Sequence, residues 1–143
     1  FTKGGFDRLI IIDGLVKPDK KGEQGDLFGV GSISTAREML TKAGVEPIQQ
    51  GVVAGICGYL LSEGERLGLD ITAILAECSP MYPDARAAAL AIEAVSELIG
   101  IEIPLSSLIE DARAIENSVQ EIFENAQNAL PAPEDTSSDP SFG

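Results

Sequence analysis

The sequence of 143 residues contains no histidine and no tryptophan, and it has only two cysteines. Without histidine, this chain cannot form a Ser-His or Cys-His nucleophile pair or a metal site with imidazole ligands. Cys57 and Cys78 cannot supply four thiolates, which excludes a structural zinc site built by this chain. No apolar run approaches the roughly 20 residues that a membrane span needs, and no signal-peptide pattern opens the sequence. We therefore expect a cytoplasmic protein without metal or cofactor and with reduced thiols, although the spacing of the cysteines leaves a disulfide open.

Positive charge is scarce in the second part of the chain. Residues 1–50 carry seven Lys or Arg and seven Asp or Glu, whereas residues 51–143 carry sixteen acidic residues and the whole net charge of −13. The cations of that second part are Arg66, Arg86 and Arg113. An acidic surface of this kind repels phosphate backbones, so nucleic-acid binding is not expected. It fits a self-repelling soluble surface or a partner with a basic rim.

Strand patterns and helix patterns alternate along the chain. Four consecutive aliphatic residues within 8–13 are typical of a strand buried on both faces, as in a parallel sheet. Further strands are expected at 27–30, within an extended segment at 45–54 and at 71–76, with helices at 35–43, 55–68, 83–99 and from Pro104 onward. The order strand, helix, strand, helix predicts a layered α/β domain with a mostly parallel sheet.

Several local features of these elements are also predicted. Thr35 to Glu38 fits a capping box, and Asp84 lies near the start of a helix whose first turn would contain Pro83. Val52–Ala54 is expected to be the most buried part of its extended segment. The predicted apolar helix faces consist of Ile56, Leu60, Leu61 and Leu67, and of Ala85, Ala88, Ala89, Ile92, Val95 and Ile99.

The last helix has a heptad-like apolar seam. Its apolar residues follow one another in steps of three and four, as in a helix that packs along its whole length. Packing on the sheet of its own domain is favoured, and packing against another subunit is the alternative. Residues 129–143 are rich in Pro, Ser and acid and are expected to be a disordered tail. The seam consists of Leu105, Leu108, Ala112, Ile115, Val119, Ile122 and Ala126.

Two short patterns resemble catalytic turns. Gly29, Gly31 and Ser34 follow a strand and precede a helix, which resembles a dinucleotide fingerprint without its third glycine. Amides at the start of that helix would face an anion. Cys57 lies in a strand-to-helix turn similar to the cysteine turn of class I glutamine amidotransferases, which require a histidine. We therefore expect Cys57, like Cys78, to be a buried and inert thiol.

A third candidate site lies after the strand at 71–76. Glu77, Tyr82 and Asp84 follow the carboxyl end of that strand, where open α/β sheets usually place their sites. The two carboxylates would serve as an acid/base pair or, in the reading that we prefer, as a helix cap and a partner of the helix dipole.

These patterns occur together in an order that resembles the archaeal proteasome-assembly-chaperone family. The resemblance covers residues 8–128, and its most specific parts are the glycine-rich turn, the strand ending in Glu77 and the sequence Tyr82-Pro-Asp-x-x-Ala-Ala. It implies an α/β/α sandwich like that of purine nucleoside phosphorylases, without a known catalytic role. Residues 1–128 would be the carboxyl-terminal part of a single α/β domain, because family members normally carry another strand–helix section upstream.

The resemblance also implies partners. Family members help to assemble proteasome α-subunits, often as homo-oligomers, and some end in a hydrophobic-Tyr-X motif that inserts between α-subunits. In this sequence Ser141, Phe142 and Gly143 take those places, with Phe for Tyr and Ser for the apolar residue. Some relatives have been grouped with ATP-grasp proteins, but this sequence has no lysine-containing phosphate loop.

The sequence thus leads to two hypotheses. The first is a non-enzymatic proteasome assembly chaperone or proteasome-binding protein. The second is a small-molecule enzyme, either a nucleotide-dependent ligase or a nucleosidase-like enzyme, with one site formed by the segments Gly29–Ser34 and Glu77–Asp84. A polar pocket joining these segments and stabilisation by a nucleotide would favour the second.

Overall fold

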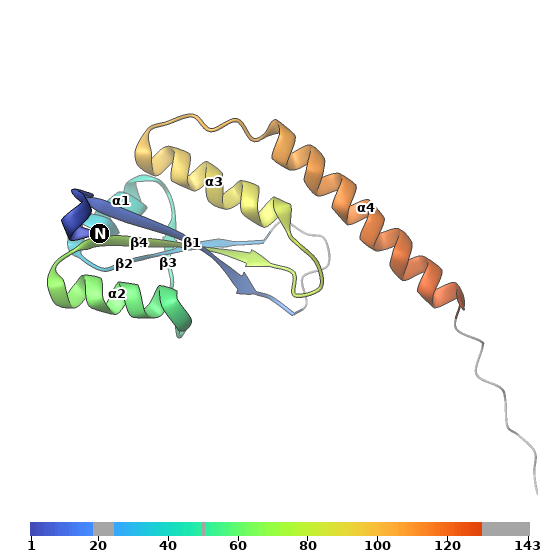
Figure 1. The fold of residues 1–143 in the computed structure, drawn as a ribbon, viewed down its shortest axis with the longest axis horizontal. Coiled ribbons are helices and arrows are strands. Elements are labelled where there is room, and N and C mark those ends of the chain that lie inside the picture. Colours follow the sequence, from blue (N-terminus) through green and yellow to red (C-terminus); the bar gives the residue numbers. More distant parts are fainter. Residues whose placement is uncertain (19–24, 50, 130–143) are drawn as a thin grey trace, which may run out of the picture.

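A computed structural model describes residues 1–18, 25–49 and 51–129 of the chain. A short 3-10 helix, Thr2–Gly4, precedes four strands and four α-helices that alternate much as the sequence predicts (Figure 1). The strands are β1 (Arg8–Val16), β2 (Leu27–Gly31), β3 (Glu46–Pro47) and β4 (Asp70–Cys78). The helices are α1 (Ser34–Lys42), α2 (Gly55–Leu67), α3 (Ala85–Ile99) and α4 (Ser106–Ala129).

The strands form one mixed sheet in the order β1-β4-β2-β3. β1 is parallel to β4 and β3 is parallel to β2, but β2 runs antiparallel to the central strand β4. The α/β class is therefore confirmed, and the sheet is mixed rather than consistently parallel. Strand–helix alternation alone does not fix the direction of a strand. Here only Glu46–Pro47 of the expected extended segment joins the sheet. The chain then continues to α2, which lies on the face of the sheet opposite to α1 (Figure 1).

Helices cover both faces of the sheet (Figure 1). On one face, α1 and α3 pack around Ile74, which is 0% exposed and forms a core with Leu40, Val45 and the alanines of α3. On the other face, α2 places Cys57 and Leu61 against Ile71, Ala73 and Leu75 of β4. Both faces of β4 are thus buried, which explains why its sequence is almost continuously apolar.

The ends of α2 and α3 follow common rules, whereas the start of α1 does not. The Asp84 side chain caps α3 by accepting a hydrogen bond from the Ala87 amide at 3.0 Å, so the predicted cap is confirmed. Gly68 and Gly100 end α2 and α3 in the left-handed conformation that glycine adopts without strain. The predicted capping box at α1 is wrong, because α1 already begins at Ser34 and no side chain caps it.

Other details differ from the sequence predictions. Val52 is 92% exposed, and Ile56 and Leu67 also lie at the surface. Leu61 is buried as predicted, but the other buried residues of α2 are Cys57 and Gly64. In α3 the buried side chains are alanines, and this allows the helix to approach the sheet closely. Of the larger apolar residues expected to face the core, Val95 is half-buried against it, whereas Ile99 is exposed. The buried alanines of α3 are Ala87, Ala89, Ala91 and Ala94.

α4 does not pack on the sheet as the favoured reading supposed. It begins alongside α3 and then runs away from the other elements (Figure 1). Ile115 and Ile122 on this helix are exposed. A sheet already covered by α1, α2 and α3 leaves α4 only the outer side of α3 to contact.

Candidate functional site

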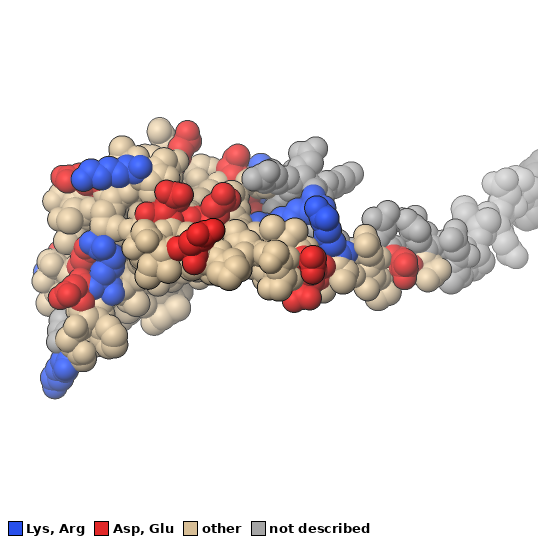
Figure 2. All heavy atoms as spheres, turned by 90° about the horizontal axis from the view of Figure 1, so that it is seen from above, with Lys and Arg blue, Asp and Glu red and all other residues tan. Residues whose placement is uncertain are grey.

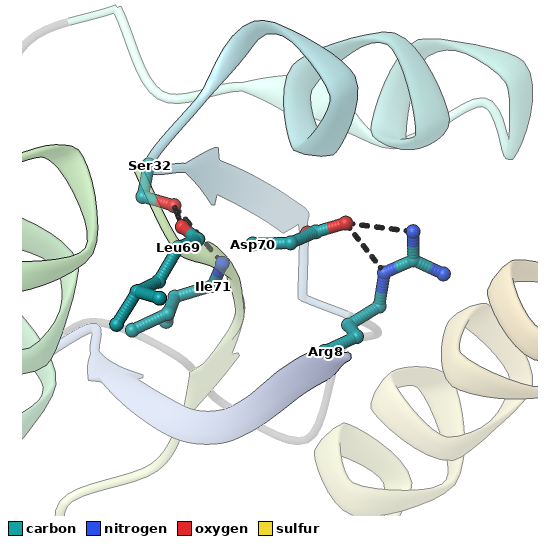
Figure 3. A network of polar contacts seen from close by, with 5 residues as sticks. All are labelled: Arg8, Ser32, Leu69, Asp70 and Ile71. Atoms are coloured by element: carbon teal, nitrogen blue, oxygen red, sulfur yellow. Dashed lines mark hydrogen bonds and ion pairs between the residues drawn. The ribbon is translucent and has the colours of Figure 1, made fainter. Parts of the chain in front are cut away.

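The chain turns from β2 into α1 beside the first residues of β4. The Ser32 hydroxyl donates to the Leu69 carbonyl at 2.7 Å and accepts from the Ile71 amide at 2.9 Å (Figure 3). Ser32 is only 5% exposed, so both bonds are shielded from water. On the strand β1 side, Arg8 binds Asp70 with two nitrogens at 3.0 and 2.7 Å. These contacts fasten the beginning of β4 to its two neighbouring strands.

Gly29 and Gly31, the glycines of the dinucleotide-like pattern, serve helix packing. A Cβ atom at Gly29 would come within 2.6 Å of the Leu40 side chain, and one at Gly31 within 2.7 Å of the Arg37 amide nitrogen. Both glycines therefore let α1 lie directly on β2. The Arg37 guanidinium returns to this turn and donates to the Gly31 and Ser32 carbonyls at 2.9 and 3.2 Å. Ser34 is an exposed residue in the first turn of α1.

Glu77 fastens the opposite end of β4. Its carboxylate accepts from the Lys17 ammonium at 2.8 Å and from the Asp26 amide at 3.0 Å, and its own amide donates to the Asp26 carbonyl. The Glu77 side chain is 11% exposed. This carboxylate thus joins the residues that follow β1 and precede β2 to the central strand.

Asp84 uses both carboxylate oxygens to shape the turn between β4 and α3. One oxygen accepts from the Ala87 amide at 3.0 Å, and the other accepts from the Ser79 amide at 3.1 Å. Tyr82 lies within the same turn and is half-buried. The geometry agrees with the preferred structural reading of Asp84 as a helix cap.

The structure does not bring the candidate pocket residues together. Because β2 is antiparallel to β4, Gly31 pairs with Thr72 at the start of β4, whereas Glu77 lies at its other end. Glu77 and Asp84 are also separated by the sheet. Glu77 lines a cavity of about 390 Å³ on the α2 side, and Asp84 lines one of about 250 Å³ on the α3 side. An acid/base pair formed by these two carboxylates therefore has no shared cavity.

Cys57 lies at the centre of the α2 core and is 1% exposed. Burial, and to a smaller extent the charge of Asp13, raises the pKa of its thiol above 9.0. Cys57 and Cys78 are not joined by a disulfide. A thiol with a raised pKa carries little thiolate near neutral pH, so the expected inert role of Cys57 agrees with its environment.

A comparison with protein families shows to which family the chain belongs. The model of the PAC2 family matches residues 1–123. The chain belongs to the PAC2 family. The resemblance drawn from the glycine-rich turn, the strand ending in Glu77 and the Tyr82 segment is confirmed.

Known proteins similar to this PAC2 chain include several from archaea. An uncharacterized protein of Methanocaldococcus jannaschii is 33% identical over 103 residues, which are 72% of this chain and 43% of that protein. The crystal structure of Pyrococcus furiosus PbaA, an archaeal homolog of proteasome-assembly chaperone, aligns with a TM-score of 0.72 and 27% identity. The alignment covers 89% of this chain and 56% of PbaA.

Pyrococcus furiosus PbaB, an archaeal proteasome activator, has the same fold. It aligns with a TM-score of 0.73 and 24% identity over 85% of this chain and 52% of PbaB. The chain thus spans about half the length of the PAC2 proteins that it matches.

Two features of this PAC2 chain escaped the sequence reasoning. One is the double role of Ser32, which depends on a contact between residues 39 positions apart. The other is a cavity of about 380 Å³ between α3 and α4, lined by Arg86 and Arg113. The scarcity of cations after residue 50 would have pointed to these two arginines. Their proximity depends on the antiparallel course of α3 and α4.

In residues 1–18, 25–49 and 51–129, no three Asp, Glu or Cys side chains are grouped so that they could hold a metal ion. None of the helices described is long and apolar enough to cross a membrane. The predicted partner-binding residues Ser141, Phe142 and Gly143 lie outside the described residues.

Proposed function

We propose that this chain is a non-enzymatic proteasome assembly chaperone, or a proteasome-binding protein, that acts on proteasome α-subunits. The observation that carries this proposal is the similarity to PbaA, with 27% identity and a TM-score of 0.72 over 89% of the chain. Membership of the PAC2 family over residues 1–123 supports it as well.

The arrangement of the candidate residues gives the alternative, a nucleotide-dependent ligase or nucleosidase-like enzyme, no comparable support. Glu77 is held by Lys17 and by a backbone amide, and Asp84 is occupied in capping α3. The space next to Gly29 and Gly31 is occupied by residues of α1. Thermal unfolding with a panel of nucleotides and nucleosides tests this alternative. We expect no rise in Tm, and a rise with one of these compounds would favour an enzyme.

The finer features follow from the same resemblance. The proposal includes a homo-oligomer in the cytoplasm and a phosphorylase-like three-layer sandwich formed within one α/β domain of residues 1–128. Several copies would matter energetically, because one short anchor ordered on binding gives weak affinity and linked anchors add avidity.

The proposed anchor is the segment Ser141–Gly143. Phe142 would supply buried area to a pocket between α-subunits, and a neighbouring carboxylate would meet a basic residue there. Deletion of these three residues should weaken binding to α-rings without changing the Tm of the chaperone. If the shortened chain binds α-rings as tightly as the full chain, the contact lies on the globular part.

The direct experiment uses native mass spectrometry with purified α-subunits from the same organism. We expect complexes of this chain with α-subunits and faster appearance of α-rings when the chain is present. A protein of similar size and net charge is the matched control, because a charge of −13 favours non-specific contacts with basic surfaces. Equal effects of the chain and of the control would overturn the proposal.

A further inference from the structure

One edge of the sheet is open along its whole length. Within residues 1–18, 25–49 and 51–129, the nine-residue strand β1 has a partner strand on one side only, because it stands first in the order β1-β4-β2-β3 (Figure 1). β1 contains no proline or lysine, the residues with which natural sheets commonly protect an edge. Two of its aliphatic side chains also lie at the surface, with Ile12 49% and Val16 58% exposed. A long aliphatic edge of this kind is a template for a further strand.

The register of β1 with β4 shows which backbone groups of β1 point away from the sheet. The two strands are parallel and pair without interruption from Arg8 with Asp70 to Val16 with Cys78. The Lys17 amide donates to the Cys78 carbonyl at 3.0 Å, so the odd-numbered residues of β1 direct their amides and carbonyls to β4. The even-numbered residues direct theirs outward. These outward-facing residues are Arg8, Ile10, Ile12, Gly14 and Val16.

The outward-facing residues are arranged symmetrically about the middle of the strand. Ile12 lies at the centre, with two outward-facing residues on either side. A second β1 laid antiparallel therefore brings every outward amide and carbonyl opposite a matching group when the two Ile12 residues face each other. This register allows about ten hydrogen bonds between the strands, which is the number typical of a protein–protein interface of standard size.

Most side chains of this register are also compatible. Directly opposite residues of antiparallel strands lie on the same face of a sheet. On the α2 face, Leu9 would meet Leu15 of the second copy, and both belong to the apolar surroundings of that core. On the α3 face, Ile10 would meet Gly14 of the second copy. Gly14 and Ile12 line a cavity of about 250 Å³ beside α3, so this position has room for a side chain.

Asp13 limits the strength of the pairing. Its carboxylate accepts a hydrogen bond at 2.8 Å from the Gly14 amide, which is one of the outward donors. In the antiparallel pair Asp13 would lie opposite Ile11 and about 7–8 Å from the Asp13 of the second copy, a diagonal position at which like charges repel. A shift of two residues in one direction would place the two Asp13 residues directly opposite, and a shift in the other direction would leave Val16 without a partner in β1. The register centred on Ile12 is therefore favoured, and the pairing is weak.

The distribution of charge favours this edge over other surfaces for contact between copies. Residues 1–50 carry equal numbers of acidic and basic residues, and β1 itself contains one of each, Arg8 and Asp13. The net charge of −13 lies in residues 51–143, and acidic side chains are spread over the face that α3 and α4 form (Figure 2). Two copies repel each other across such acidic surfaces, whereas the β1 edge brings together segments without net charge.

We propose that two copies of this chain pair through β1, antiparallel and with their Ile12 residues at the two-fold axis, so that the two sheets continue as one. A contact of this kind uses the same surface of both copies, as in most dimers with two-fold symmetry. The inference rests on the proposed function only for the homo-oligomer, to which it gives a defined contact.

Sedimentation equilibrium of the full chain, without α-subunits, measures the pairing. We expect a reversible dimer with a Kd on the order of 10–100 µM, because the contact adds hydrogen bonds but buries few side chains that are exposed in the monomer. Ile12→Lys should weaken the dimer by about tenfold or more, because it places two ammonium groups face to face at the axis. Asp13→Ala should strengthen it by about two- to five-fold, because it removes the like-charge contact and frees the Gly14 amide.

Ile56→Lys is the matched control for Ile12→Lys. It makes the same change at an exposed isoleucine of α2, away from the β1 edge, and should leave the Kd unchanged. Far-UV circular dichroism and Tm should show that Ile12→Lys is folded, since half of the Ile12 side chain is exposed.

A disulfide tests the register independently of the affinity. Opposite hydrogen-bonded residues of antiparallel strands have Cα atoms about 5.5 Å apart, which is within the range of a disulfide. Ile12→Cys should therefore crosslink two copies under mild oxidation. The parent for this experiment is Cys78→Ala, because Cys78 lines the same cavity as Ile12. Val16→Cys is the matched control, because the two Val16 residues would lie about 26 Å apart in this register.

Three results would overturn the inference. The first is a chain that remains monomeric well above the expected Kd, which would leave the β1 edge for a strand of another protein. The second is an equal Kd for Ile12→Lys and Ile56→Lys. The third is crosslinking of Val16→Cys as fast as that of Ile12→Cys. None of these experiments contains α-subunits, so a negative result leaves α-ring binding untouched, and the mass-spectrometric experiment measures that binding separately.

Discussion

Replacement of Ser32 by alanine should lower the free energy of unfolding more than the same replacement of an exposed serine in this chain. The hydroxyl holds two buried backbone groups, the Leu69 carbonyl at 2.7 Å and the Ile71 amide at 2.9 Å (Figure 3). Alanine leaves both groups without this partner at a position that is 5% exposed. A buried polar group left unpaired costs about 1–3 kcal/mol.

The loss is a large fraction of the stability of a domain of this size, which is typically about 5–15 kcal/mol. At a middle value of about 2 kcal/mol, Tm should fall by roughly 5–10 °C. Urea unfolding monitored by circular dichroism measures the difference directly, and an unchanged m-value would indicate that the unfolding reaction itself is the same.

Ser34→Ala is the matched control, because Ser34 is exposed in the first turn of α1 and its side chain does not cap the helix. We expect a change within about 0.5 kcal/mol for this control. If Ser32→Ala and Ser34→Ala have equal free energies of unfolding, Ser32 does not fasten β4 to the turn before α1.

Three further predictions concern Gly58, Cys57 and Asp84. Gly58→Ala should lower the free energy of unfolding by about 1–3 kcal/mol, because the new Cβ would overlap the Val53 carbonyl. Ser62→Ala, at an exposed position of the same helix, is the control in urea unfolding. Equal stability of the two variants would contradict this close contact. The raised pKa of Cys57 means that the unfolded chain loses the thiol proton first, so stability should decrease as pH rises above 9.0, and Cys57→Ala should remove this part of the decrease. Folded protein should also react with iodoacetamide at Cys57 much more slowly than urea-unfolded protein, and equal rates would contradict the burial. Asp84→Ala should lower the free energy of unfolding by about 1–2 kcal/mol, because α3 loses its cap. A variant that loses a nucleotide-dependent activity but keeps its free energy of unfolding would contradict this structural role.

The positions of the long elements could be predicted because local signals define them. Four aliphatic residues identify β1, the run at 71–76 identifies β4, and glycines end α2 and α3. These signals depend only on neighbouring residues and on burial. The family could also be inferred, because its motifs occur in a fixed order along the chain.

The direction of β2 and the faces of the helices could not be predicted in the same way. Whether β2 is parallel or antiparallel to β4 depends on contacts between residues about 45 positions apart, such as Gly29 with Ile74. In α3, alanines occur on several sides of the helix, so the sequence does not show which of them meet the sheet. The separation of Glu77 from Asp84 is a result of tertiary structure, because one lies on a strand and the other begins a helix on the opposite face.

The central position of β4 has a consequence for synthesis on the ribosome. β1 pairs with β4 through residues 62 positions apart, as in the contact of Arg8 with Asp70. At about 5–20 residues per second, roughly 3–12 s separate the translation of these two strands. During this interval β1 has no partner strand in the described sheet, and Ile10, Ile11 and Ile12 are not yet covered by it.

Pairing between such distant strands also slows refolding, because a long loop must close before the contacts can form. β2 depends on the same event, since β4 is its partner on one side. The nascent chain therefore carries an aliphatic segment with an incomplete sheet until residue 78 has been made. A ribosome-associated chaperone that binds short aliphatic segments would find such a segment in β1 during this interval.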